Sequence, residues 1–309
     1  MSDDSNTGVY TTLPELTLLR HQAAGFTLLP RQPVHSLLAG THASKLRGRG
    51  LNFEELRRYL PGDDVRQIDW KVTARTRKPH VRVYTEERER PVILVVDQRL
   101  GMFFGSQLLM KSVAAAQAAA LCAWRTIAVK DRIGAIVFND QQTVEVRPQY
   151  SSATVMRILQ SIVQLNQELT VDTQQVDKPA MLNAALQKAQ RMAVHDCLVM
   201  LITDGNGSDP QTQRICTEIA EHNDVMVTFV FDPLEAELPD AGRLIVSDGQ
   251  QELEFEANRS RLRHQYRDDF AAIRAKGRKF LLSREVPVLP LSTAEPVTQQ
   301  FARQFGLQR

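Results

Sequence analysis

Short apolar runs alternate, from residue 91 onward, with longer segments in which apolar residues recur every three or four positions. The runs, such as 92–96 and 197–203, are rich in Val, Ile and Leu and suit strands buried on both faces of a parallel sheet. The longer segments have the period of amphipathic helices. This alternation predicts an α/β fold with a doubly wound, mostly parallel sheet.

The expected strands are 92–96, 132–138, 143–147, 197–203, 225–231 and 286–291. The expected helices are 106–129, 151–165, 180–194, 210–221, 259–282 and 295–305. Ser106, just after Gly105, is the predicted cap of the first of these helices. Alternating residues around Asp248-Gly249 predict a hairpin insertion near 243–256.

The first 90 residues have a different character. Residues 1–12 have the composition of a frayed tail, and 45–82 hold 11 Lys/Arg against 5 Asp/Glu, a local balance of +6 (11 − 5). Turn residues such as Pro61-Gly62 and an alternating stretch at 80–85 indicate a small β-containing module. We therefore expect two domains: residues 1–90, with the tail and the module, and residues 91–309.

Composition limits the functional classes. The net charge is only +2, so the chain has no global attraction for nucleic acid or membranes. No apolar run approaches the ~20 residues that span a bilayer, so membrane insertion is not expected. The polar start of the chain and three sparse cysteines (Cys122, Cys197 and Cys216) favour a reducing cytoplasm.

Catalytic signatures are missing from the sequence. It contains no Gly-x-Ser-x-Gly, His-Glu-x-x-His, Cys-x-x-Cys or phosphate-binding loop, so we expect neither an enzyme nor a bound cofactor. The basic residues between 45 and 82 could follow a phosphate backbone, but acids interrupt them and their spacing matches no RNA-binding motif. Ion pairs or an acidic protein partner explain them better than nucleic acid does.

Two acids stand at the ends of predicted strands, where open α/β sheets bind their ligands: Asp97 and Asp204. The stretch from Val92 through Asp97 and its loop resembles the first strand of a von Willebrand factor A domain. There, an Asp-x-Ser-x-Ser loop, a Thr and a second Asp hold a divalent cation. The two serine positions are Arg99 and Gly101 in this chain, and 177–179 reads Asp-Lys-Pro where the resemblance implies the Thr.

A guanidinium next to two carboxylates competes directly with a divalent cation. We therefore expect Arg99 to pair with Asp97 or Asp204, leaving a degenerate metal-ion-dependent adhesion site that does not bind Mg²⁺ appreciably. The alternative is a metal-dependent hydrolase or nuclease that uses Asp97, Asp204 and Asp209 as ligands.

A second motif precedes the predicted α/β domain. It reads Phe53-Glu54-Glu55-Leu56-Arg57-Arg58-Tyr59-Leu60-Pro61-Gly62-Asp63-Asp64-Val65-Arg66-Gln67-Ile68-Asp69-Trp70-Lys71. The motif resembles the signature of the bacterial family called domain of unknown function 58. This resemblance implies a non-enzymatic adaptor or co-chaperone that works with an AAA+ ATPase of the MoxR class on a client protein.

Within the signature, Pro61-Gly62 predicts a turn, Asp63 or Asp64 can cap a short helical piece at 65–68, and Trp70 is expected to pack as an anchor. The signature is either a rigid scaffold, a partner-contact surface, or both. The expected partner-contact residues are Arg57, Asp63, Asp64, Arg66, Asp69, Trp70, Lys71 and, at the carboxyl ends of the strands, Arg99.

Overall fold

The structure is a computed structural model that describes residues 8–23, 51–86, 90–170, 178–247, 252–282 and 286–306. It divides into two compact units. The large unit comprises Met1–His35 and Arg90–Arg309, and the small unit comprises Ser36–Glu89. The small unit is therefore an insertion in the sequence of the large one.

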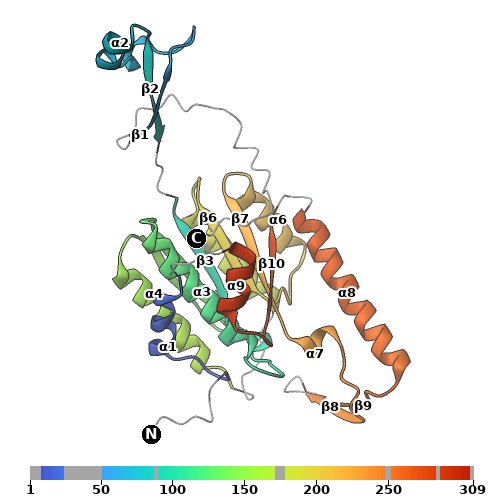
Figure 1. The fold of residues 1–309 in the computed structure, drawn as a ribbon. Helices are drawn as coiled ribbons and strands as arrows, with labels where there is room; N and C mark the ends of the chain where they lie inside the picture. The colour runs from blue at the N-terminus through green and yellow to red at the C-terminus, as the bar shows by residue number, and fades with distance from the viewer. Residues whose placement is uncertain are drawn as a thin grey trace. The chain divides into compact units, whose positions relative to one another are not determined.

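A six-stranded sheet forms the centre of the large unit, in the order β10-β7-β6-β3-β4-β5 (Figure 1). All neighbours pair in parallel except β5, which runs antiparallel to β4 at one edge. The strands are β3 (Val92–Asp97), β4 (Ile133–Phe138), β5 (Thr143–Gln149), β6 (Leu198–Thr203), β7 (Asp224–Phe231) and β10 (Val288–Ser292). Every residue of β3, β4 and β6 is buried, which confirms the predicted α/β fold.

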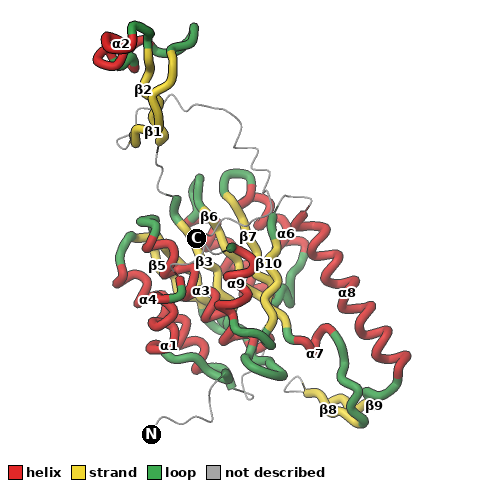
Figure 2. Tube along the Cα trace, in the orientation of Figure 1, coloured by secondary structure: helices red, strands yellow, loops and turns green. Residues whose placement is uncertain are grey.

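Helices cover both faces of this sheet (Figure 2). Helices α1, α3, α4 and α9 form the core on the face of Leu94 and Val96, whereas α5 and α6 pack on the face of Ile93 and Val95. These helices are α1 (Leu13–Leu18), α3 (Lys111–Ala128), α4 (Ser152–Gln167), α5 (Lys178–Met192), α6 (Pro210–Ala220) and α9 (Val297–Phe305). Three shorter pieces are η2 (Leu19–His21), η6 (Leu100–Met102) and α7 (Pro233–Ala236).

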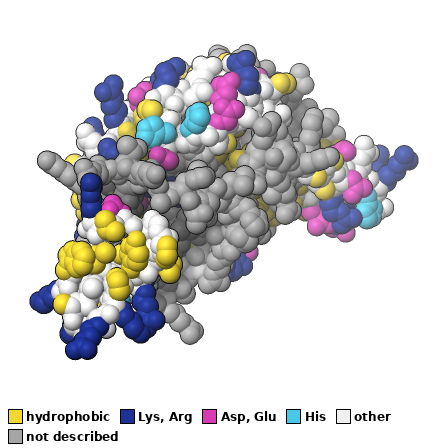
Figure 3. All heavy atoms as spheres, turned by 90° about the horizontal axis from the view of Figure 1, so that it is seen from above, with side chains coloured by type: hydrophobic (Ala, Val, Ile, Leu, Met, Phe, Trp, Pro, Cys, Tyr) yellow, Lys and Arg dark blue, Asp and Glu magenta, His cyan; other side chains and the backbone are white. Residues whose placement is uncertain are grey.

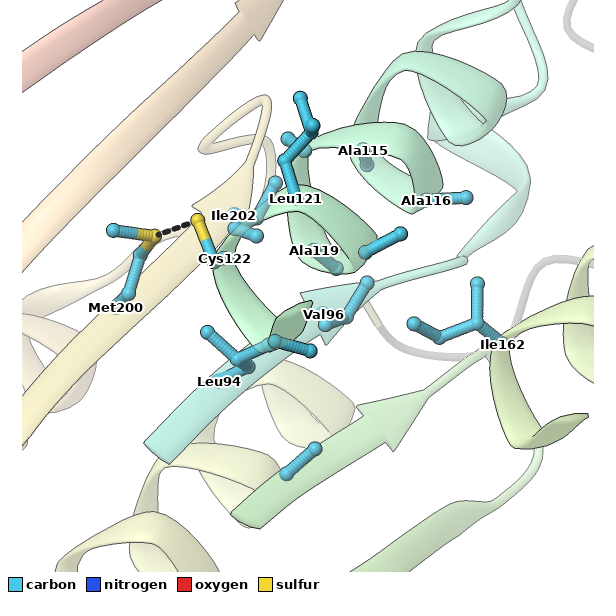
Figure 4. Packing of buried hydrophobic residues seen from close by; sticks show 14 of the residues in the cluster. Leu94, Val96, Ala115, Ala116, Ala119, Leu121, Cys122, Ile162, Met200 and Ile202 are labelled. Carbon is cyan, nitrogen blue, oxygen red and sulfur yellow. Dashed lines mark hydrogen bonds between the residues drawn. The ribbon is translucent and has the colours of Figure 1, made fainter. Parts of the chain in front are cut away.

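Helix α3 contributes small side chains to the contact between the helices and the sheet. Ala115, Ala116 and Ala119 are fully buried, and Cys122 meets Met200 of β6 with 3.3 Å between the two sulfur atoms (Figure 4). Small residues let the helix axis approach the strands closely, and alanine is also the strongest helix former.

The start of α3 differs from the prediction. The helix begins at Lys111 after an N-cap position held by Met110, so the expected cap at Ser106 is wrong. The hydroxyl of Ser106 instead donates to Asp232, just after β7, at 2.6 Å. Ser106 therefore ties the loop before α3 to the end of another strand.

Residues 8–23 pack on the large unit. The Tyr10 hydroxyl donates to the carbonyl of Leu169 at 2.8 Å, and the Trp124 indole donates to the carbonyl of Leu16 at 3.0 Å. Leu16 is fully buried. Residues 8–12 are therefore not part of a frayed tail, and residues 8–23 belong to the large unit instead of the predicted domain 1–90. The division between Glu89 and Arg90 lies one residue before the predicted boundary between residues 90 and 91.

The predicted hairpin is present as β8 (Arg243–Ser247) and β9 (Glu252–Glu256), which pair antiparallel. Its predicted turn at Asp248-Gly249 lies outside the described residues. The long helix α8 (Ser260–Leu282) follows, and the hairpin lies at its first turns, away from the six-stranded sheet (Figure 1).

The small unit is a two-stranded antiparallel ribbon, β1 (Leu51–Arg58) and β2 (His80–Glu86), joined by η5 (Val65–Gln67) and helix α2 (Trp70–Thr76). Between residues 56 and 81, only Asp69 and Val81 are buried. A ribbon of two strands needs a further packed layer for independent stability. Between residues 56 and 81, the small unit thus buries few of its side chains.

Candidate functional site

The carboxyl ends of β3 and β6 are the candidate site. Within the sheet, β4 and β5 lie on one side of β3, and the chain then crosses to β6, which lies on the other side of β3. Open α/β sheets bind ligands at such a change of direction, beyond the carboxyl ends of the strands. Asp97 is the last residue of β3 and Asp204 directly follows β6, so the structure places both predicted acids there.

Asp97 accepts four hydrogen bonds. Its Oδ1 accepts from the backbone N–H of Arg99 at 3.0 Å and from the Arg99 Nε at 2.9 Å. Its Oδ2 accepts from the Arg99 Nη2 and from the Thr203 hydroxyl, each at 2.6 Å. A carboxylate has about four lone-pair positions, and this one uses them all.

Arg99 is enclosed in the large unit, with a side chain only 4% exposed. In addition to its contacts with Asp97, its Nη2 donates to the carbonyl of Asn206 at 3.0 Å, and its guanidinium lies 5.5 Å from the ring centre of Phe138. Burial would lower the pKa of Arg99, but the negative charges of Asp97, Asp204 and Asp140 raise it above its usual value. The expected pairing of Arg99 with Asp97 is confirmed.

A second buried cation, Lys111, pairs with Asp204. Its Nζ donates to Asp204 Oδ2 at 2.8 Å and to Glu235 Oε1 of α7 at 2.5 Å, and its side chain is 1% exposed. Burial would lower the pKa of Lys111, yet the two carboxylates raise it, so the amine stays charged. Asn206 donates to Asp204 as well, through its backbone N–H at 2.9 Å and its amide at 2.7 Å.

Sequence reasoning missed Lys111. One signal was available: Lys111 is the only charged residue in a stretch from 107 to 124 that is otherwise largely apolar. A lone cation within an apolar helix is either exposed at an end or paired inside, because an unpaired buried charge is too costly.

The loop after β3 is fixed by further contacts. The backbone N–H of Leu100 donates to Asp140 Oδ2 at 2.6 Å. A Cβ added at Gly101 would lie 3.6 Å from Asp204 Oδ2, so this position faces the second acid. Asp97, Arg99, Gly101 and Asp204 therefore do converge, as the sequence predicted.

The donor set does not fit a divalent cation. Mg²⁺ requires near-octahedral oxygen ligation. Here the lone pairs of Asp97 are all engaged, and each acid touches a buried, fixed positive charge: Arg99 at Asp97 and Lys111 at Asp204. A metal ion at this position would have to displace both cations.

The alternative ligand set is not assembled. Asp209 is the N-cap of α6, where it accepts from the backbone N–H of Thr212 at 2.7 Å and from the Asn183 amide at 3.2 Å. These hydrogen bonds lower the pKa of Asp209. Within the described ranges, no three His, Cys, Asp or Glu side chains form a group that could hold a metal. Asp177, at the expected threonine position, lies outside those ranges.

Three aspartates of the signature have structural roles in the small unit. Asp63 forms a bidentate pair with Arg57 at 2.7 and 2.8 Å. Asp64 caps η5 by accepting from the N–H of Arg66 at 2.9 Å, as predicted for one of the two neighbouring acids. Asp69 is buried and caps α2.

Two predicted partner-contact residues differ from expectation. Trp70 is 69% exposed, so its predicted packing as an anchor is wrong. Arg99 is buried, so a direct contact between its guanidinium and a partner was also a wrong expectation. Arg66 and Lys71 are exposed.

The chain matches the family described as "Protein of unknown function DUF58" over residues 55–279, and it belongs to that family. It is 30% identical over 275 residues to the uncharacterized proteins Mb1516 of Mycobacterium bovis and Rv1480 of Mycobacterium tuberculosis, covering 86% of this chain and 82% of each relative. The mostly parallel sheet of the large unit, with helices on both faces, is the arrangement expected from the resemblance to von Willebrand factor A domains.

Solved structures with a similar fold include two proteins from Bacteroides. One is an aerotolerance-related membrane protein from Bacteroides fragilis (TM-score 0.43, 12% identity, 70% of this chain and 98% of that one). The other is BatB from Bacteroides thetaiotaomicron (TM-score 0.39, 14% identity, 69% and 98%). In the described part of this chain, each helix is too short or too polar to cross a bilayer.

Proposed function

We propose that this protein is a non-enzymatic adaptor or co-chaperone that works with an AAA+ ATPase of the MoxR class in the assembly or remodelling of protein complexes. Family membership and the von Willebrand factor A-like fold favour a protein-interaction module. The proposal adds that its metal-ion-dependent adhesion site is degenerate and that its partner contacts do not require a bound cation.

The pairing of Arg99 and Lys111 with the two site acids carries this proposal. Arg99 links the loop after β3 to the loop after β6 through Asp97 and the carbonyl of Asn206. Lys111 links Asp204 to Glu235 of α7. Two side-chain cations thus connect the loops that a metal ion would otherwise hold together.

The cysteines support a non-enzymatic role. Burial raises the pKa of Cys216 to about 11 and raises the pKa of Cys122 further, while burial and Asp196 raise that of Cys197. A thiol is nucleophilic as the thiolate, so at neutral pH none of the three is activated.

The test is a binding measurement between the purified protein and a MoxR-class ATPase from the same organism, with nucleotide present. We expect binding that weakens as salt rises, because exposed charges are screened. Arg66→Glu, in the small unit, should weaken binding more than Arg214→Glu, the same charge reversal at an exposed arginine of α6. If wild type does not bind under any nucleotide condition, the ATPase partnership is wrong.

A complementary assay addresses the enzymatic alternative. Nuclease, phosphatase and protease substrates should show no turnover with Mg²⁺ or Mn²⁺. Metal-dependent turnover that Asp204→Ala abolishes would overturn the non-enzymatic role.

A further inference from the structure

Four large apolar side chains of the small unit are exposed. Their exposed fractions are 38% for Leu56, 59% for Leu60, 58% for Val65 and 69% for Trp70. The space-filling view shows hydrophobic side chains gathered in a patch that Lys and Arg side chains border (Figure 3). Because so much apolar area in so small a unit remains in contact with solvent, it is typical of an interaction surface.

Hydrogen bonds, not packing, fix the positions of these residues. The N–H of Leu60 donates to Asp63 Oδ2 at 2.8 Å, and the N–H of Asp63 donates back to the Leu60 carbonyl at 3.0 Å. Val65 and Trp70 are the first residues of η5 and α2, each preceded by an aspartate cap. A surface fixed in this way loses little conformational entropy when it binds.

The exposed charges in this part of the small unit are mostly positive. Between residues 56 and 81 the exposed cations are Arg58, Arg66, Lys71, Arg75, Arg77 and Lys78. Over the same range, Asp64 is the one exposed acid, because Asp63 is half-buried against Arg57 and Asp69 is buried. The complementary ligand therefore combines large apolar groups with negative charge.

We propose that this basic apolar patch (Leu56, Leu60, Val65 and Trp70, with the cations around them) docks an acidic amphipathic segment of a partner protein. Such a segment presents large apolar side chains flanked by Glu or Asp. The proposal rests on the adaptor function and names the chemistry that the partner must show. The partner's apolar side chains would cover the four apolar side chains that are exposed in the small unit.

Two observations favour a protein over an anionic lipid surface. The exposed carboxylate of Asp64 is adjacent to Val65, and it would be repelled by an evenly anionic lipid surface, whereas a protein segment can place its acids beside the cations alone. Exposed Trp together with Arg is also the composition of the energetic centres of protein–protein interfaces.

The protein provides its own reporter, because its two tryptophans are Trp70 and Trp124, and Trp124 is buried. In full-length Trp124→Phe, the fluorescence of Trp70 is followed while a synthetic helical peptide is added, with Leu on one face and Glu on the others. We expect a saturable blue shift and reduced quenching by acrylamide. The double reversal Arg66→Glu/Lys71→Glu should weaken peptide affinity by about tenfold or more.

Trp70→Phe is the matched control, since its remaining Trp124 should not respond to the peptide. If Trp124→Phe does not fold, the spectrum of wild type minus that of Trp70→Phe gives the same signal. A peptide of identical composition in scrambled order should bind at least about tenfold more weakly.

Three results would overturn the proposal. The first is a response to vesicles of phosphatidylcholine and phosphatidylglycerol with none to the peptide. The second is that, without peptide, Trp70 becomes less accessible to acrylamide as the protein concentration rises, while light scattering gives the mass of a dimer. The third is equal binding of the acidic and scrambled peptides.

Failure of this patch is distinguishable from failure of the adaptor function. If the ATPase binds wild type and Trp70→Ala/Leu60→Ser equally well, the basic apolar patch is not the docking site, and the adaptor role stands. If the peptide binds but the ATPase does not, the patch stands and the ATPase is the wrong partner.

Discussion

The carboxyl ends of β3 and β6 and the basic apolar patch of the small unit use charge in opposite ways. At the strand ends, Arg99 and Lys111 are almost fully buried, and each is held by carboxylates at hydrogen-bonding distance. In the patch, the cations are exposed and surround apolar side chains that are exposed as well. The charges of the first region pair with one another inside the protein, and those of the second region remain accessible to a ligand.

The difference separates stability from binding. Removing one member of a buried ion pair leaves the other member uncompensated, which is strongly destabilising. Removing an exposed charge changes the stability little but alters the association with charged partners. Substitutions in the two regions should therefore give opposite profiles.

The largest effect is expected for Lys111→Met, which leaves Asp204 and Glu235 without their shared cation. The large unit should lose free energy of unfolding toward the upper end of about 3–5 kcal/mol, measured by urea denaturation and circular dichroism. Lys71→Met, an exposed control, should stay within about 0.5 kcal/mol of wild type. Equal losses in the two variants would mean that the buried cation contributes no more to the free energy of unfolding than an exposed one does.

The next effect concerns Arg99. Arg99→Ser should lose about 3 kcal/mol, because Asp97 then stays buried without its partner. Since the guanidinium is gone, millimolar MgCl₂ should raise the unfolding temperature of Arg99→Ser, and more so that of Arg99→Ser/Gly101→Ser, but not that of wild type. If Arg99→Ser unfolds like wild type and ignores Mg²⁺, Arg99 is no substitute for a cation.

A smaller effect involves Asp232, a buried acid outside both regions. Burial would raise its pKa, but hydrogen bonds from Ser106, Thr293 and the N–H of Leu234 lower it overall. A lowered pKa in the folded state stabilises the protein above the ordinary pKa of 3.8, and this contribution disappears as pH falls through the folded value.

Asp232→Asn should therefore lose about 2 kcal/mol at neutral pH. It should also show a weaker decline in stability between about pH 5 and pH 2 than wild type does. Urea denaturation across this pH range measures both effects. Asp268→Asn, an exposed acid on α8, is the control; the same flattening in that variant would contradict a specific role for Asp232.

The smallest effect on stability is expected in the patch. Trp70→Ala and Leu60→Ser should each stay within about 0.5 kcal/mol of wild type, because both side chains are already exposed. Val81→Ala, at a buried position of the same unit, should cost more. A large loss in the two exposed variants, seen by thermal unfolding, would mean that this surface is covered in the free protein.

Local patterns in the sequence were sufficient for the strands of the six-stranded sheet and for one of the two buried ion pairs, whereas β1 was not predicted. The apolar runs of β3 and β6 have the composition that burial on both faces requires. Arg99 follows Asp97 by two residues in the same loop, so their pairing depends on local geometry. Both features follow from neighbouring residues.

Contacts between distant residues were not accessible in the same way. Lys111 and Asp204 are 93 residues apart, and no local pattern indicates which acid a buried lysine meets. The exposure of Trp70 was missed for a related reason: an apolar side chain is buried only where the rest of the fold supplies a core. Ser106 has the composition of a helix cap, but Asp232, 126 residues away, accepts from its hydroxyl.

The position of residues 8–23 has a consequence for how the chain folds during synthesis. The backbone N–H of Thr11 donates to Asn166 and the hydroxyl of Tyr10 donates to Leu169, across separations of 155 and 159 residues. The ribosome therefore releases this segment, and then the whole inserted small unit, before α4 exists to receive it. Closing so long a loop slows folding. Leu16 of α1 therefore stays exposed to solvent and to chaperones until α3 and α4 have emerged, so α1 is synthesised early and buried late.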